Sequence, residues 1–305
     1  MKVTTWYTKE DCKDWNDFLN KVRKLPQDTF YRGQKSYPFD KPQIQSSFDR
    51  AANSAKGAVD EARKHKRELW EYEAAIIREF MRRAHHYVSD TPQNEDRLEW
   101  LSLMRHFGAP TRLVDFTYSY YIAAYFAFSN LGDEDRAVWA IDQDWLRNES
   151  QKHCKSILGS TSRKEIDVST PEKFTKCFLD PTRKSRASRF FVAPVNAERM
   201  NTRLTIQQGC FLCSSNIQKP FEYNLSSMVT KSSCQQFIVK FVIPHSARND
   251  ALTELKHMNI TKASLFPDLG GLAESLNDRF ELLFKDYNIE TATLKKVVTW
   301  HKRIW

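Results

Sequence analysis

The sequence has no uninterrupted run of 18 apolar residues, so nothing in it predicts a segment that spans a membrane. Its first residues, 1–6, contain no apolar stretch of the kind that a secretory signal requires. The six cysteines are scattered along the 305 residues rather than spaced as a disulfide framework, which favours reduced thiols. Together these absences predict a cytoplasmic protein without a membrane anchor.

Several signatures of known chemistry are also missing. The chain has no Walker-type phosphate loop, no Gly-x-Gly-x-x-Gly fingerprint and no Gly-x-Ser-x-Gly elbow. Cys210 and Cys213 have the spacing of half a zinc site, but no second pair of cysteines or histidines has ligand spacing. On a strand these two thiols would point to opposite faces. We therefore expect no metal.

The charge balance favours anionic partners. Lysine and arginine number 47 against 38 aspartate and glutamate, for a formal net charge of +9. Such an excess is typical of proteins that bind nucleotides, nucleic acids or acidic surfaces. The local basic clusters are more typical of solvated helix faces, and they lie at 63–67, at 78 with 82–83, and at 183–186 with 189.

The apolar periodicity predicts an α+β fold with a helix-rich N-terminal half packed on a mostly antiparallel sheet. We interpret the chain as one domain over 1–305, in which the polar, weakly patterned segment 147–187 is an insertion or flexible excursion. Residues 35–55, rich in proline and polar groups, are predicted to be loop. Helices are expected over 14–25, 58–88, 98–107, 118–131, 247–258 and 269–277, and strands over 29–33, 137–141, 189–194, 209–214, 236–243 and 297–300.

The segment 106–117 concentrates polar side chains in a predicted loop between two apolar helices. His106 can act as an acid, a base or a ribose-binding donor near neutral pH. Arg112 and Asp115 lie three residues apart, so either they pair with each other or they face a ligand. Thr117 is also a suitable N-cap for the helix that follows. The density of these groups beside a glycine and a proline predicts a functional site.

Two other motifs carry candidate binding groups. Arg32 stands before Gly33 at the end of a predicted strand, where a planar guanidinium can meet a phosphate or carboxylate. The alternative is an arginine that holds a loop by binding carbonyls or a core carboxylate. Further along, Arg203, Gln207 and Gln208 precede another glycine, and their amides are suited to contact a ribose or a base.

On these motifs the chain resembles the FRG-domain family. The resemblance covers roughly residues 6–276, interrupted at 147–187, and tyrosine stands at position 31 where the Phe-Arg-Gly motif has phenylalanine. It implies a bacterial or phage-linked cytoplasmic protein, with some members in defence-like or toxin-like settings. Five ordered blocks carry it: Tyr31-Arg32-Gly33-Gln34, the 106–117 segment, Ala123-Ala124-Tyr125-Phe126-Ala127, Arg203 to Phe211, and Ser264 to Gly271.

The order of these parts also looks like that of ADP-ribosyltransferases, in which an arginine or histidine holds NAD and a late glutamate contacts the ribose. This similarity implies that Arg32 clamps a pyrophosphate and that His106 contacts ribose or amide. Gln208 would stand near the place of the glutamate, but an uncharged amide cannot stabilise developing positive charge as a carboxylate does. Asp115 is the candidate to replace it. The other expected members of the pocket are Tyr31, Gly33, Gln34, Thr111, Arg112, Thr117, Arg203 and Gln207.

Three functions remain open at this point. The first is an enzyme that cleaves NAD or transfers ADP-ribose to an acceptor such as nucleic acid, with Arg32, His106, Asp115 and Gln208 as its catalytic residues. The second is a non-enzymatic module that binds a nucleotide or a nucleic acid. The third is an internal Arg–Asp–Thr network that organises the fold, with function on a protein-partner surface.

Overall fold

The computed structural model describes residues 6–35, 44–129, 132–180, 189–229 and 237–285, the side chains of 278–285 excepted. The chain divides into two compact units, Met1–Glu254 and Leu255–Trp305. The strand expected near 297–300 lies outside the described residues. Within the described part, no helix combines the length and the apolar character that crossing a bilayer would require.

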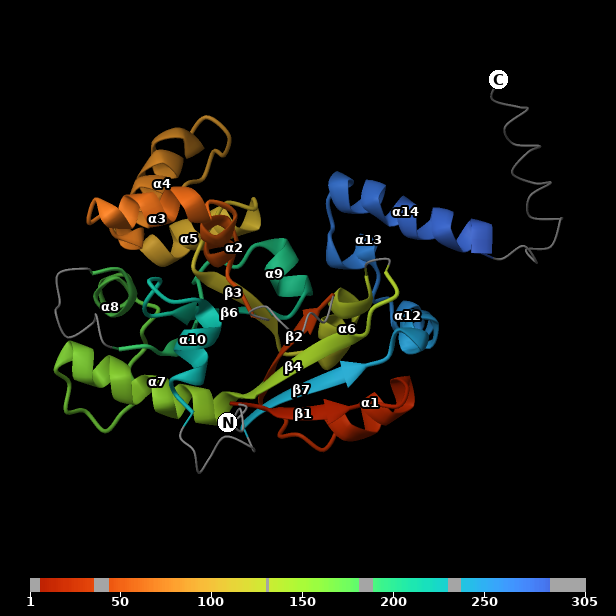
Figure 1. Ribbon diagram of the computed structural model, residues 1–305. Helices are drawn as coiled ribbons and strands as arrows, with labels where there is room; N and C mark the ends of the chain where they lie inside the picture. The colour runs from red at the N-terminus through yellow and green to blue at the C-terminus, as the bar shows by residue number, and fades with distance from the viewer. Residues whose placement is uncertain (1–5, 36–43, 130–131, 181–188, 230–236, 286–305) are drawn as a thin grey trace, which may run out of the picture. The chain divides into compact units, whose positions relative to one another are not determined.

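A seven-stranded sheet forms the centre of the first unit, in the order β1-β7-β4-β2-β3-β6-β5 (Figure 1). Only β1 and β7 pair in parallel, and every other neighbouring pair is antiparallel. The α+β fold with a mostly antiparallel sheet is therefore confirmed. The strands are β1 (Thr8–Asp11), β2 (Thr29–Gln34), β3 (Leu113–Thr117), β4 (Arg136–Asp142), β5 (Val192–Val195), β6 (Gly209–Ser214) and β7 (Ile238–Ile243).

Several helices start at a residue whose side-chain oxygen caps the first turn. Asp14, Asp96 and Asp142 each accept a hydrogen bond from a backbone N–H in the first turn of the helix that follows. The helices of the first unit are α1 (Trp15–Val22), α2 (Ser47–Ser54), α3 (Lys56–Lys64), α4 (Leu69–Ala84), α5 (Arg97–His106), α6 (Tyr120–Phe128), α7 (Gln143–Leu158), α8 (Pro171–Phe174), the π-helix η1 (Thr175–Leu179), α9 (Thr202–Ile206), α10 (Phe221–Ser226) and the short η3 (His245–Ala247). Next come α12 (Arg248–His257), α13 (Lys262–Leu265) and α14 (Leu269–Lys285).

Helices cover the central strands, which are apolar at almost every position. Every residue of β6 and β7 is buried, as expected for strands covered on both faces. Helix α1 packs on β7 through Phe18 and Phe241, whose ring centroids lie 5.6 Å apart. Helix α6 packs on β2 and β4, and its backbone passes so close to Gly33 that a side chain there has no room.

Two predicted boundaries are wrong for local reasons. The segment predicted as loop contains α2, because Ser46 and Asp49 form a capping box that starts a helix despite the polar composition. The single helix expected over 58–88 is two helices, α3 and α4. The chain breaks between them at Lys66, whose φ of 58° lies in the left-handed region.

The segment 147–187 contributes to the core where the structure describes it. Cys154 and Ile157 on α7, together with Phe174 and Phe178, belong to the main hydrophobic cluster. Its origin as an insertion stays a prediction, and residues 181–188 lie outside the described part. The side chains that face the core are widely spaced along this polar stretch, so the helical pattern is weak in the sequence.

The ammonium of Lys240 is buried in the middle of β7, which makes the stability of the fold depend on pH. Its Nζ lies 4.9 Å from the centroid of the Trp139 ring. Burial lowers the pKa of Lys240 from 10.5 to about 7; the charge of Glu222 opposes this shift, and the smaller repulsion from Lys9 adds to it. Between these two pKa values the unfolded chain binds the extra proton, so the free energy of unfolding rises with pH in this window.

We therefore expect Lys240→Met to remove an increase in stability that the wild-type protein gains between pH 7 and pH 8.5. Urea unfolding of both proteins at the two pH values measures the effect. The difference between them isolates Lys240 from other groups that titrate in the same range. An identical pH dependence in both proteins would contradict the assignment.

Candidate anion-binding site

The site begins where strands β2 and β3 separate. The two strands share one register pair, Tyr31 with Thr117, whereas β2 pairs with β4 over all six of its residues. Beyond that pair the Arg32 side chain spans the gap and donates from Nη1 to the main-chain carbonyl of Asp115. Its guanidinium carbon lies 5.9 Å from the centroid of the Phe116 ring. The guanidinium of Arg32 thus lies where the pairing between β2 and β3 ends.

Helix α5 brings a second arginine to the same point. Arg105, in the last turn of α5, donates from Nε to Oδ1 and Oδ2 of Asp115 at 3.1 and 2.9 Å, and from Nη2 to Oδ2. The Asp115 side chain is 40% exposed and that of Arg105 is 22% exposed, so both are accessible from solvent. Burial alone would raise the pKa of Asp115, but the charges of Arg105 and Arg32 outweigh it and hold that pKa below its usual range.

A third arginine comes from α2. The start of this helix is fixed to the segment before β3, because the Thr111 N–H donates to Ser47 Oγ at 2.9 Å and the Phe48 N–H donates to the Thr111 carbonyl at 3.0 Å. Arg50, one turn into α2, is thereby held where its charge acts on both Arg105 and Asp115.

The three guanidiniums repel one another. The pKa of Arg32 is lowered to about 10, first by burial and then by Arg105 and Arg50, with Asp115 opposing the shift. The pKa of Arg50 is lowered by burial and by Arg105. Three positive charges against one carboxylate leave a formal charge of +2 on this arginine cluster, by which we mean Arg32, Arg50 and Arg105 together with Asp115. Among the described residues, Arg32 and Arg50 form no ion pair within 4 Å.

Chemically, such an arrangement receives anions. Guanidinium groups bind phosphate and carboxylate oxygens through paired N–H donors, and they stay charged near neutral pH. The model of the FRG domain matches residues 27–136, which contain all four members of the arginine cluster. The chain carries an FRG domain. No curated protein and no solved structure matches the chain.

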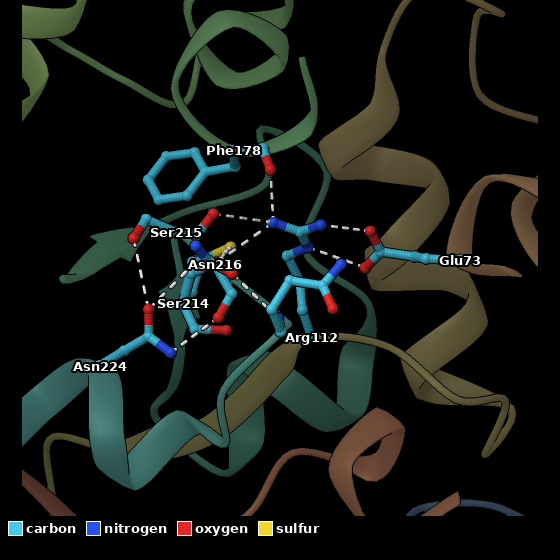
Figure 2. Close-up of polar contacts among 9 residues, drawn as sticks. Glu73, Arg112, Phe178, Ser214, Ser215, Asn216 and Asn224 are labelled. Carbon is cyan, nitrogen blue, oxygen red and sulfur yellow. Dashed lines mark hydrogen bonds and ion pairs between the residues drawn. The ribbon is translucent and has the colours of Figure 1, made fainter. Parts of the chain in front are cut away.

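Arg112, the arginine of the 106–117 segment, has a different place in the structure. Arg112 is 2% exposed, and it pairs with Glu73 of α4 through Nε at 2.7 Å and through Nη2 (Figure 2). Its Nη1 donates to the carbonyls of Phe178, Ser214 and Ser215. These contacts connect α4, η1 and the end of β6 through one buried side chain.

The prediction that Arg112 and Asp115 pair with each other is therefore wrong, and the buried Arg112 does not face a ligand site. The two do not pair with each other, because Arg112 binds Glu73 and Asp115 binds Arg105. Burial by itself would lower the pKa of Arg112, but the Glu73 carboxylate outweighs burial and raises this pKa above its usual value. The buried guanidinium therefore stays charged. The segment predicted as a loop runs into strand β3, and alternate residues of a strand point to opposite faces.

A second group of predicted residues meets at the other end of β3. Thr117 Oγ1 donates to the Gln207 carbonyl at 2.8 Å and accepts from the Ser119 N–H at 3.1 Å. The N-cap of α6 is Ser119, so the prediction of Thr117 as that cap is wrong. Gln208 is exposed with a φ of 44°, and its carbonyl accepts from the Tyr118 N–H at 3.0 Å. These contacts join the two residues that follow α9, through their main-chain carbonyls, to the end of β3.

The remaining predicted residues lie around the FRG domain in varied settings. Tyr31 is buried against Tyr120, with ring centroids 5.7 Å apart. Gln34 Oε1 accepts from the Trp139 indole N–H at 2.8 Å. The others are Gly33 beneath α6, the buried Thr111, Arg203 on α9, and His106, the half-buried last residue of α5.

Sequence reasoning missed Arg50 and Arg105. Arg105 directly precedes His106, and its place in the last turn of a predicted helix was the only local signal available. Arg50 gave no signal, because it lies in a segment predicted as loop and reaches the site only through the Ser47–Thr111 contact.

Cys210 and Cys213 are both buried on β6.

The basic clusters of α3 and α4 are largely paired within their own helices. Arg63 with Asp60 and Lys64 with Glu61 form exposed pairs on α3. On α4, Glu79 contacts two arginines of the 82–83 cluster. Such pairs reduce the field available to a nucleic acid. The cluster at 183–186 lies outside the described residues.

Proposed function

We propose that the FRG domain binds a nucleotide through its phosphate groups at the arginine cluster. The observation that supports this most directly is that Arg105 binds the partly exposed Asp115 carboxylate while Arg32 binds the main-chain carbonyl of the same residue, with the charge of Arg50 acting on this pair. Repulsion among neighbouring guanidiniums destabilises a site that holds no anion, and such groups of arginines are typical of anion-binding sites. The N–H groups of Arg32 and Arg50 that carbonyls do not use are available to phosphate oxygens.

We expect Arg32→Ala to weaken the binding of ADP and of inorganic pyrophosphate by at least about tenfold, or roughly 1.4 kcal/mol. The reason is that the most central guanidinium of the cluster is lost. Isothermal titration calorimetry on the folded proteins measures the effect. Arg63→Ala is the matched control, since Arg63 is an exposed arginine on α3 with its own acidic partner. Equal affinity in Arg32→Ala and wild type would reject the site.

A second candidate is the cleavage of NAD at the same site, which the likeness to ADP-ribosyltransferases implied. Asp115 favours it, because a carboxylate with a lowered pKa stays ionised next to the arginines that would hold a pyrophosphate. Such a group can stabilise the positive charge that develops on a ribose during cleavage. The Arg105 ion pair reduces that effect, which is why binding is the first proposal.

Nicotinamide release from NAD tests the second candidate, with and without DNA or RNA as an acceptor. Cleavage by the wild type that disappears in both Arg32→Ala and Asp115→Asn would establish it. Binding of NAD without release would leave the FRG domain as a nucleotide-binding module. A setting in phage defence stays an expectation from the family resemblance.

A further inference from the structure

Asp115 occupies the cluster as an anion would. Its two oxygens accept three hydrogen bonds from Arg105, and its main-chain carbonyl accepts one from Arg32. A carboxylate and a phosphate present similar oxygen pairs to a guanidinium fork. Among the described residues, Asp115 is the one carboxylate within 4 Å of an arginine of the cluster.

Its position also allows exchange. The Asp115 side chain is 40% exposed, so water and ligands can reach its oxygens. Arg105 Nη1 takes no part in the contacts with Asp115, which leaves a donor on that guanidinium for an incoming oxygen. An ion pair with this exposure is held by modest energy, unlike the buried pair of Arg112 and Glu73.

We propose that Asp115 is an internal counter-ion that occupies Arg105 until a phosphate group replaces it, and that it thereby sets the charge of the preferred ligand. This inference rests on the proposed function. With Asp115 in place the cluster carries +2, which matches a phosphomonoester or a dinucleotide pyrophosphate, each with about two negative charges. Without the carboxylate the cluster would carry +3 and would favour ligands of higher charge.

Asp115→Asn tests the proposal directly, with AMP and ADP as probes that carry about two and three negative charges. We expect the variant to bind both nucleotides at least about tenfold more tightly than wild type, since one repulsive charge is removed. The preference for ADP over AMP should increase several-fold, and the affinity should fall more steeply with salt. Asp60→Asn, on the exposed face of α3, removes the same charge elsewhere and should change nothing.

Two further variants keep the test decisive. Asp115→Ser removes the same charge with a smaller side chain, and it replaces Asp115→Asn if thermal unfolding shows that the amide variant is not folded. Arg105→Gln removes the guanidinium that the phosphate would take over, and it should weaken AMP binding at least about tenfold. Wild-type affinity in Arg105→Gln would overturn the proposal.

The outcomes separate the two proposals. Weaker nucleotide binding in a folded Asp115→Asn variant would make Asp115 a positioning residue and reject the counter-ion role. Binding that depends on Arg32 but is indifferent to Asp115 would also reject it, while leaving the proposed function intact. If neither AMP, ADP nor pyrophosphate binds the wild type, the proposed function itself fails.

Discussion

Arg112→Ala is expected to lower the free energy of unfolding of the protein by about 3–5 kcal/mol. The change leaves the Glu73 carboxylate buried without its partner and removes the donors of three main-chain carbonyls. Removing one member of a buried ion pair costs far more than removing both, because the desolvated charge that remains is not compensated. Urea unfolding followed by circular dichroism measures the loss.

The double variant Arg112→Met with Glu73→Leu is the control. It replaces both charges by apolar groups of similar size, so it should recover at least half of the stability lost in Arg112→Ala. A loss below about 1 kcal/mol in Arg112→Ala would show that the pair contributes as little as a surface ion pair does. Either result is independent of nucleotide binding, because Arg112 is not a member of the arginine cluster.

Gly33→Ala is expected to destabilise the domain by about 2–3 kcal/mol or to prevent folding, as overpacking of a filled core does. A Cβ at this position would lie 2.0 Å from the Ala123 carbonyl oxygen and 2.6 Å from the Ala127 nitrogen, both backbone atoms of α6. Backbone cannot turn aside as a flexible side chain can, so α6 would have to move away from β2.

Gly57→Ala provides the matched comparison, because a Cβ at Gly57 meets nothing within 4 Å. Gly57 lies in α3, where alanine is the better helix former, so this variant should be neutral or up to about 1 kcal/mol more stable. The thermal midpoints of the two variants are compared with wild type. A Gly33→Ala protein as stable as Gly57→Ala would mean that α6 does not fix the close approach.

Close packing against α6 therefore explains why glycine stands at position 33, and the sequence alone did not indicate this contact. The sequence placed Gly33 among the expected members of the pocket, whereas in the structure α6 occupies the space beside it. Arg32, its neighbour on the strand, points to the other face and donates to the main-chain carbonyl of Asp115, which matches the alternative of an arginine that binds carbonyls. Two neighbouring residues of one strand thus contact different parts of the structure, Gly33 the backbone of α6 and Arg32 the main chain of β3.

Elements with a strong local pattern were predicted well. The spacing of Trp15, Phe18 and Val22 located α1, and the apolar run 137–141 located β4, because burial of one face or of a whole strand leaves a direct mark on the sequence. Helix α2 and strand β3 were missed. The first is a short polar helix that starts at a capping box. The second has only five residues and carries the charge of Asp115 in its middle, which Arg105 neutralises.

The partners of the charged residues could not be predicted. Arg112 and Asp115 are close in sequence, yet each pairs with a helix that arrives from elsewhere, Arg112 with α4 and Asp115 with α5. Spacing along the chain reports only local contacts, whereas ion pairs in a core are chosen by the packing of whole elements. The hypothesis of an internal structural network was thus right that Arg112 makes buried structural contacts. It was wrong about the partner, which is Glu73 and not an aspartate.

The single register pair between β2 and β3 makes that boundary a seam in the sheet, with β1, β7, β4 and β2 on one side and β3, β6 and β5 on the other. Arg32 belongs to one side of the seam, and Arg105 reaches Asp115 on the other. A ligand bound by Arg32 and Arg105 at once would therefore link the two parts of the sheet. Its binding free energy would then add to the resistance of the seam to opening, by about 2.7 kcal/mol at a ligand concentration one hundred times its dissociation constant. Ligand binding should therefore slow the amide hydrogen exchange of β2 and β3.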